Sequence, residues 1–130
     1  MSAHFPDGEG IFETIKTLDG LPFALSRHIA RATRSARKLN LPIPSESDIR
    51  QAISWQLAES AISTEVGRLR VSFSTSGEIY LLHENYVRWT HPARLTILDI
   101  PVEENALLVG VKALPYVQNI ALLELAQTKL

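Results

Sequence analysis

The amino-acid sequence predicts an α+β fold, in which an antiparallel sheet is flanked by two helices and followed by the start of a second domain. Two stretches alternate apolar and polar residues, two stretches between them carry apolar residues at helical spacing, and turn signals close the alternating stretches. The 130 residues are about one domain by length, and 45% hydrophobic with 21% charged residues is ordinary for a globular protein.

Two β-hairpins are expected. Residues 11–17 alternate, Asp19-Gly20 is a turn signal, and residues 21–25 supply the returning strand. The second hairpin shows the same three features at residues 68–74, 76–77 and 79–82.

Two helices are expected between the hairpins. The first covers about residues 27–39 with Ser26 as its N-cap, and it ends where prolines follow. The second covers about residues 48–60, with Ser45 or Ser47 as the cap. Each helix carries one apolar face, so both should pack against the sheet.

The last third of the chain is expected to leave this domain. Leu95–Ile100 predicts a further strand, residues 101–106 a charged loop, and the apolar residues from Tyr116 onward a helix. We therefore divide the chain into an N-terminal α+β domain, 1–104, and a linker with the start of a second, truncated, cofactor-binding domain, 105–130.

Composition narrows the classes of function. A formal net charge of −1 gives no reason to expect nucleic acid or an anionic membrane as a partner. The absence of cysteine excludes disulfides and a thiol nucleophile, and it fits a cytoplasmic protein. The four histidines show no metal-ligand spacing, so no metal is assigned.

Lys112 is the most informative single residue, because nearly all its neighbours in sequence are apolar. Desolvation disfavours an ammonium ion, and a neutral amine attacks carbonyl carbon, so this setting suits a Schiff-base lysine. The alternative is a lysine whose stem packs among apolar groups while its ammonium extends into water.

The first predicted helix is strongly basic. Arg27, Arg31, Arg34 and Lys38 fall near one face at helical spacing. One of these arginines could bind a phosphate bidentately, since the guanidinium fork matches phosphate oxygens. The alternative is a solvated basic face without a ligand.

Three stretches, in order along the chain, carry a resemblance to a known family: Gly8–Gly20, His28–Leu39 and Gly110–Asn119. The first contains a glycine-acid-glycine sequence and a Phe-Glu pair, and the second contains a His-x-x-Arg motif ending at Arg31. The third keeps a Lys-x-x-x-Tyr-x-x-Asn spacing that begins at Lys112. Together they resemble the class IV aminotransferases, the fold-type IV pyridoxal-phosphate enzymes.

The resemblance implies pyridoxal 5'-phosphate as the cofactor, an amino acid or amino-chorismate as the small-molecule substrate, and a homodimer. Lys112 takes the role of the Schiff-base lysine, and Arg31 that of the arginine that binds the cofactor phosphate. Phe12 occupies a substrate-pocket position where the family often has a tyrosine.

The match covers only the first half of the family's length. The remaining cofactor contacts are then expected beyond Leu130, and the 130-residue chain alone is expected to be inactive. The turn at residues 74–77 lacks an arginine that many members use for the substrate carboxylate. That absence weakens the case for a typical branched-chain or D-amino-acid transaminase and leaves room for the lyase branch, which resembles 4-amino-4-deoxychorismate lyase; both activities stay open. The alternative from another class is a non-catalytic interaction module, built on the apolar C-terminal helix and the basic helix.

Overall fold

The computed structural model describes residues 10–114 and 117–130. Gly8 and Glu9 of the glycine-acid-glycine sequence, and Tyr116 of the lysine motif, lie outside the described residues. The elements follow in the order β1 (Gly10–Leu18), β2 (Leu21–Pro22), α1 (Leu25–Lys38), α2 (Glu46–Glu59), β3 (Val66–Ser74), β4 (Ile79–Asn85), β5 (Ala113–Leu114) and α3 (Val117–Lys129).

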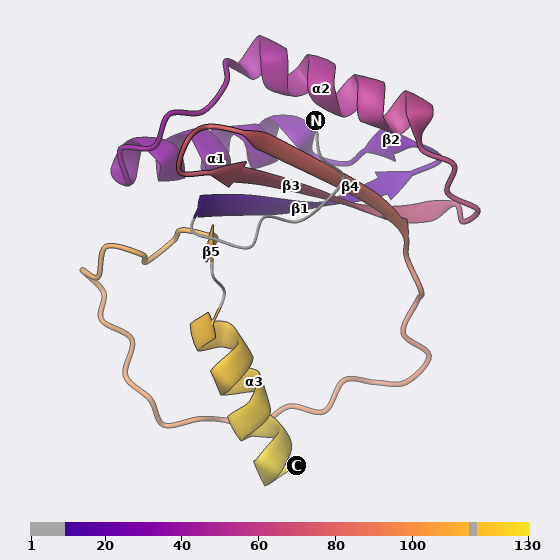
Figure 1. The fold of residues 1–130 in the computed structure, drawn as a ribbon. Coiled ribbons are helices and arrows are strands. Elements are labelled where there is room, and N and C mark those ends of the chain that lie inside the picture. Colours follow the sequence, from indigo (N-terminus) through magenta and orange to yellow (C-terminus); the bar gives the residue numbers. More distant parts are fainter. Residues whose placement is uncertain (1–9, 115–116) are drawn as a thin grey trace.

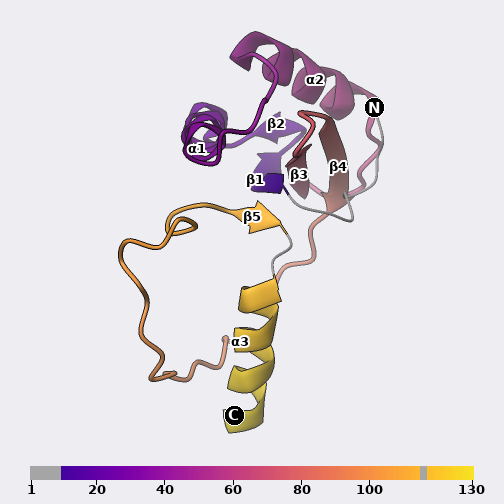
Figure 2. The same cartoon turned by 60° about the vertical axis from the view of Figure 1, so that its left-hand side comes forward.

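The predicted α+β class is confirmed. The strands form one antiparallel sheet in the order β2-β1-β3-β4, and β5 pairs with β1 as well. Helices α1 and α2 lie on one side of this sheet, whereas α3 lies on the other side (Figures 1 and 2). The long central pairing of β1 with β3 runs from Gly10 opposite Ser74 to Leu18 opposite Val66.

The core lies between the sheet and the two helices. Alternate residues of a strand point to the same face, so one face of the sheet is apolar and meets the apolar stripes of α1 and α2. The buried side chains of this core are Ile11, Ile15, Ile29, Ala32, Ala36, Ile49, Ile53, Leu69, Val71, Phe73 and Leu81.

Both predicted hairpins and both predicted helices are present, with shifted ends. The returning strand of the first hairpin is short, because the chain enters α1 at Leu25. Ser26 is not the N-cap: Ala24 holds that position with a left-handed backbone, and the Ser26 hydroxyl accepts a hydrogen bond from Arg50 instead. Ser45 does cap α2, because its hydroxyl accepts a hydrogen bond of 3.1 Å from the backbone N–H of Asp48.

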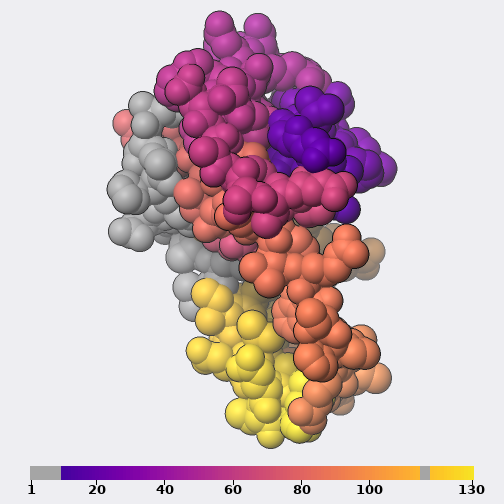
Figure 3. All heavy atoms as spheres, turned by 90° about the vertical axis from the view of Figure 1, so that its right-hand side faces the viewer, coloured from indigo at the N-terminus to yellow at the C-terminus, as the bar shows by residue number. Residues whose placement is uncertain are grey.

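The predicted strand at Leu95–Ile100 is wrong. These residues form no strand, and Leu95 and Ile97 are 88% and 91% exposed. They belong to an extended segment that leaves β4 and passes the C-terminal end of α3, where Arg94 donates to the carbonyl oxygen of Leu130 (Figures 1 and 3). An alternating sequence forms a strand only when a partner strand satisfies its backbone groups, and no strand of the described residues pairs with this segment.

Strand β5 was not predicted. It comprises only Ala113 and Leu114, which pair with Ile11 and Gly10 at the start of β1. Two residues are too few to show a periodicity in the sequence. The pairing nevertheless matters for the site, because it brings Lys112, immediately before β5, to the edge of β1.

Candidate active site

The backbone of β1 holds Lys112 in place. The Phe12 N–H donates a hydrogen bond of 2.9 Å to the carbonyl oxygen of Lys112, which continues the pairing of β5 with β1. Residues opposite each other in an antiparallel pair point to the same face of the sheet. The Lys112 ammonium accordingly lies over the Phe12 ring, 4.1 Å from its centroid.

The environment of Lys112 favours its neutral amine. Burial lowers the pKa of Lys112 below its ordinary value, and the nearby cations Arg31 and Arg70 lower it further, whereas the Glu13 carboxylate opposes them. The side chain is partly buried. Sequence reasoning expected this effect from apolar neighbours, and the structure adds two arginines as a second cause.

Glu13 is a buried acid on the helix-facing side of β1. It is 3% exposed, and it occupies the same face as the core residues Ile11 and Ile15. A carboxylate in such a place requires charged or hydrogen-bonding partners to offset its desolvation. Helix α1 supplies these partners.

Arg31 binds Glu13 side-on through two hydrogen bonds. Its Nε donates to Oε1 at 2.8 Å, and its Nη2 donates to Oε2. Such a two-point pair sets both the position and the plane of the guanidinium. The Arg31 side chain is 41% exposed while that of Glu13 is 4% exposed, so the pair runs from the core to the surface.

His28 is the third member of this cluster, which we call the Glu13 cluster (Glu13, His28 and Arg31). Its Nδ1 lies 2.7 Å from Glu13 Oε2. A carboxylate only accepts hydrogen bonds, so Nδ1 carries a proton and donates. One buried acid therefore organises both members of the His-x-x-Arg motif, which lie almost one helical turn apart.

The basic face predicted for the first helix is present and hollowed. An open cavity of about 530 Å³ on α1 is lined by the four polar residues Arg27, His28, Arg31 and Arg34, with Ala24 and Ala30 between them. Lys38, the fourth predicted cation of this face, instead donates to the carbonyl oxygen of Val109 at 3.0 Å. Arg31 thus contacts the Glu13 carboxylate on one side and the cavity on the other.

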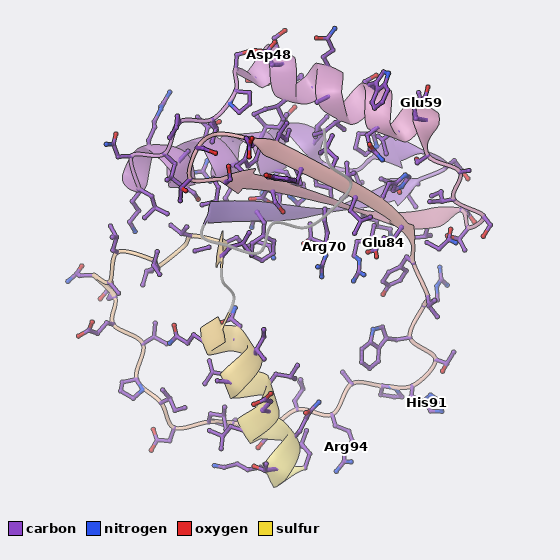
Figure 4. The ribbon with its side chains drawn as sticks, viewed as in Figure 1. Asp48, Glu59, Arg70, Glu84, His91 and Arg94 are labelled. Atoms are coloured by element: carbon purple, nitrogen blue, oxygen red, sulfur yellow. The ribbon has the colours of Figure 1, made fainter. Side chains whose placement is uncertain are left out.

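Arg70 was missed at the sequence level. It lies on β3 opposite Thr14, on the face of the sheet that also carries Phe12. Figure 4 shows Arg70 and Glu84 on the side of the sheet that faces away from α2. The signal was its position in the alternating stretch, since an arginine between buried Leu69 and Val71 must point to the opposite face.

The structure therefore brings the three predicted site residues into one neighbourhood. Phe12 lies under the Lys112 ammonium, and Arg31 is close enough for its charge to lower the pKa of Lys112. Glu13 belongs to the Phe-Glu pair of the first motif. It bonds to both His28 and Arg31, and the sequence did not reveal these hydrogen bonds.

Comparison with known proteins identifies the family. Residues 10–129 match the amino-transferase class IV family, and the chain belongs to it. This is a family of aminotransferases and lyases that depend on pyridoxal phosphate. The resemblance inferred from the three motifs is thereby confirmed.

Two known proteins show how far the similarity extends. The bifunctional aminodeoxychorismate lyase / D-amino acid transaminase of Mycobacterium tuberculosis is 35% identical over 72 residues, which are 55% of this chain and 25% of that protein. The crystal structure of a putative 4-amino-4-deoxychorismate lyase from Legionella pneumophila superposes with a TM-score of 0.70 at 24% identity. That superposition covers 88% of this chain and 47% of the other, so the chain spans about half of that structure.

No helix within residues 10–114 and 117–130 is long and apolar enough to cross a membrane.

Proposed function

We propose that this chain provides the Schiff-base lysine and the phosphate-binding arginine of an aminotransferase or lyase that uses pyridoxal 5'-phosphate. The proposal rests on the environment of Lys112. This amine has a lowered pKa, lies over the Phe12 ring and is close to the Glu13 cluster, which contains Arg31. These groups fit the cofactor, whose aldehyde requires a neutral amine and whose phosphate requires a cation.

Lys112 has two tasks in this proposal. Its neutral amine would hold the cofactor, and the same amine would move a proton at the reacting carbon of the substrate as general base and acid. When bound, the cofactor supplies an electron sink for the bond that breaks next to the substrate nitrogen. The lowered pKa serves both tasks, because only an unprotonated amine can attack or accept a proton.

Arg31 and Phe12 have supporting tasks. Arg31 binds the phosphate from α1, with its guanidinium plane set by Glu13. Phe12 forms an apolar wall under the Lys112 amine, which limits the access of water to it. A phenylalanine has no hydroxyl to act as an acid, so proton transfer on this wall falls to Lys112.

The substrate class that we propose is an amino acid or an amino-chorismate, with the lyase reaction as one of two outcomes. The partial similarity to a bifunctional lyase and transaminase supports both reactions equally. The turn after β3 favours the lyase, since residues 74–77 are Ser-Thr-Ser-Gly without a cation for a substrate carboxylate. A homodimer remains a prediction from the family resemblance.

The decisive experiment is reduction of a mixture of this chain and pyridoxal phosphate with borohydride, followed by peptide mapping. We expect the adduct on Lys112. The chain has three other lysines, Lys16, Lys38 and Lys129, which serve as internal controls for non-specific labelling. Equal labelling of all four lysines, or none on Lys112, would contradict the proposed cofactor site.

A second assay separates the two reactions. The lyase releases pyruvate from aminodeoxychorismate without a keto acid, whereas the transaminase needs a keto acid as amino acceptor. Lys112→Ala is the control for both, because each reaction needs its amine. Because the 130 residues alone are expected to be inactive, this assay counts against the substrate assignments only in a protein of the family's full length. Adduct formation on Lys112 without either activity in such a protein would leave the cofactor site standing and remove both substrate assignments.

A further inference from the structure

The carboxylate of Glu13 receives three hydrogen bonds, two from Arg31 and one from His28. Both partners come from α1, and both also line the cavity on that helix. Glu13 itself does not line this cavity, because it is buried between the helix and β1. Its position suits a residue that holds ligand-binding groups and does not touch the ligand.

We propose that Glu13 is a positioning residue that orients Arg31 for the cofactor phosphate, with the His28 Nδ1–H as a second donor that holds the Glu13 carboxylate in place. This inference rests on the proposed function and deepens it. Glu13 occupies the Nε–Nη2 edge of the guanidinium, so a phosphate in the cavity would meet Arg31 from its Nη1 side. His28 helps to fix Glu13, because its Nδ1–H donates to Oε2, the carboxylate oxygen that also accepts from Arg31 Nη2.

A second arginine–glutamate pair in the chain provides a comparison. Arg68 donates to Glu84 between β3 and β4, and their side chains are 41% and 36% exposed. Arg31 is as exposed as Arg68, at 41%, but its acid is 4% exposed. In the Arg31 pair the buried acid can hold the arginine in place while the guanidinium faces solvent. In the Arg68 pair both partners are exposed, and such a pair contributes little to stability.

Glu13 also acts on Lys112. Its charge raises the pKa of Lys112, whereas Arg31 lowers it. Neutralising Glu13 should therefore move adduct formation on Lys112 to lower pH, because more of the amine is then unprotonated. A purely structural role of Glu13 in folding would not produce this pH shift in a folded variant.

The test compares pyridoxal phosphate with pyridoxal, which lacks the phosphate. In the 130-residue chain, Glu13→Gln preserves shape but removes the charge. We expect its dissociation constant for pyridoxal phosphate to rise about tenfold, the scale of one charged hydrogen bond, while that for pyridoxal changes less than about twofold. The control Glu84→Gln should leave both constants unchanged.

A double-mutant cycle tests whether Glu13 acts through Arg31. In an Arg31→Gln background, Glu13→Gln should have no further effect on the ratio of the two constants. Independent, additive effects would overturn the inference. So would a Glu13→Gln variant that is folded by circular dichroism and retains the wild-type preference for the phosphorylated cofactor.

The failure of the inference differs from the failure of the proposed function. If the unmutated chain forms no borohydride adduct on Lys112, the proposed function fails; if it does and Glu13→Gln changes neither the ratio nor the pH profile, only the inference fails. Should Glu13→Gln not fold, nuclear magnetic resonance of the unmutated chain with inorganic phosphate replaces it. We expect shifts at Arg31 and His28 while the Arg31 Nε–H stays protected, and loss of that protection would overturn the role of Glu13.

Discussion

The Lys112 ammonium lies 4.1 Å from the centroid of the Phe12 ring, and the Phe12 N–H donates to the Lys112 carbonyl oxygen. One residue of β1 therefore positions both the backbone and the amine of the proposed catalytic lysine. Because the backbone contact survives substitution of the ring, the two contributions can be separated.

Phe12→Leu should increase the reactivity of Lys112. Leucine keeps an apolar side chain at this position but removes the ring that stabilises the ammonium form, so the pKa of Lys112 should fall further. We expect the rate of adduct formation with pyridoxal to rise about two- to fivefold at neutral pH. Phe12→Tyr keeps the ring and serves as the control; a decrease in rate for Phe12→Leu would contradict the prediction.

Arg31→Gln should weaken the binding of pyridoxal phosphate by about 10- to 100-fold, the range for loss of a charged hydrogen bond with a phosphate. Binding of pyridoxal should change much less. The matched controls are Arg27→Gln and Arg34→Gln, which remove the other two arginines that line the same cavity. The absorbance of the bound cofactor measures the affinity of each of the three variants. An equal loss of affinity in all three would favour a basic face that attracts phosphate without a specific ligand.

His83 predicts a dependence of stability on pH. This residue of β4 forms hydrogen bonds with two hydroxyl groups. Its Nε2 lies 2.8 Å from Thr17 Oγ1, and its Nδ1 bonds with Ser60 Oγ. Burial lowers the pKa of His83 in the folded chain below its ordinary value near 6.5. The unfolded chain therefore binds the proton first, so the contribution of His83 is complete above about pH 6.5 and is lost as the pH falls below it.

Urea unfolding between pH 8 and pH 5 measures this effect. His83→Gln should lower the free energy of unfolding at pH 8 and flatten its decline toward pH 5. The exposed His91 offers a control, since His91→Gln should leave the curve unchanged. A wild-type slope in His83→Gln would show that other groups cause the decline.

Ser45→Ala should destabilise the chain by about 1 kcal/mol, because the cap hydroxyl accepts the Asp48 N–H at the start of α2. Ser47, the alternative cap in the sequence, lies inside the helix. Ser47→Ala should accordingly be neutral or slightly stabilising, as alanine favours helix. Thermal melts of the two variants distinguish the positions, and equal losses would contradict the assignment of the cap.

Local sequence patterns predicted the two hairpins and two helices well. Residues 11–17 and 68–74 alternate because each strand buries one face, and that face is the observed core. The start of α1 could not be predicted in the same way. Ser26 is a suitable cap by residue type, but a contact with Arg50 of α2 uses its hydroxyl, and that partner is distant in sequence.

The same distinction between local sequence patterns and distant contacts applies to the residues of the site. Lys112, Arg31 and Phe12 could be selected from their motifs, because the family resemblance concerns residue types at given spacings. Glu13 carried a signal that was not used, since an acid at an inward position of an apolar strand must have partners. Its partners remained unknown because nothing in a strand specifies which helix face will cover it.

By itself, the sequence determined the α+β class, the family and the identity of the proposed lysine and arginine. Only the tertiary structure decided that Leu95–Ile100 forms no strand and that the pairing of β5 with β1 places Lys112 beside β1. It also decided that Glu13 bonds to His28 and Arg31. Periodicity and motifs are properties of neighbouring residues, and they are visible in one dimension. Strand partners and buried ion pairs depend on the packing of distant segments, whose energies are settled only when the chain has folded.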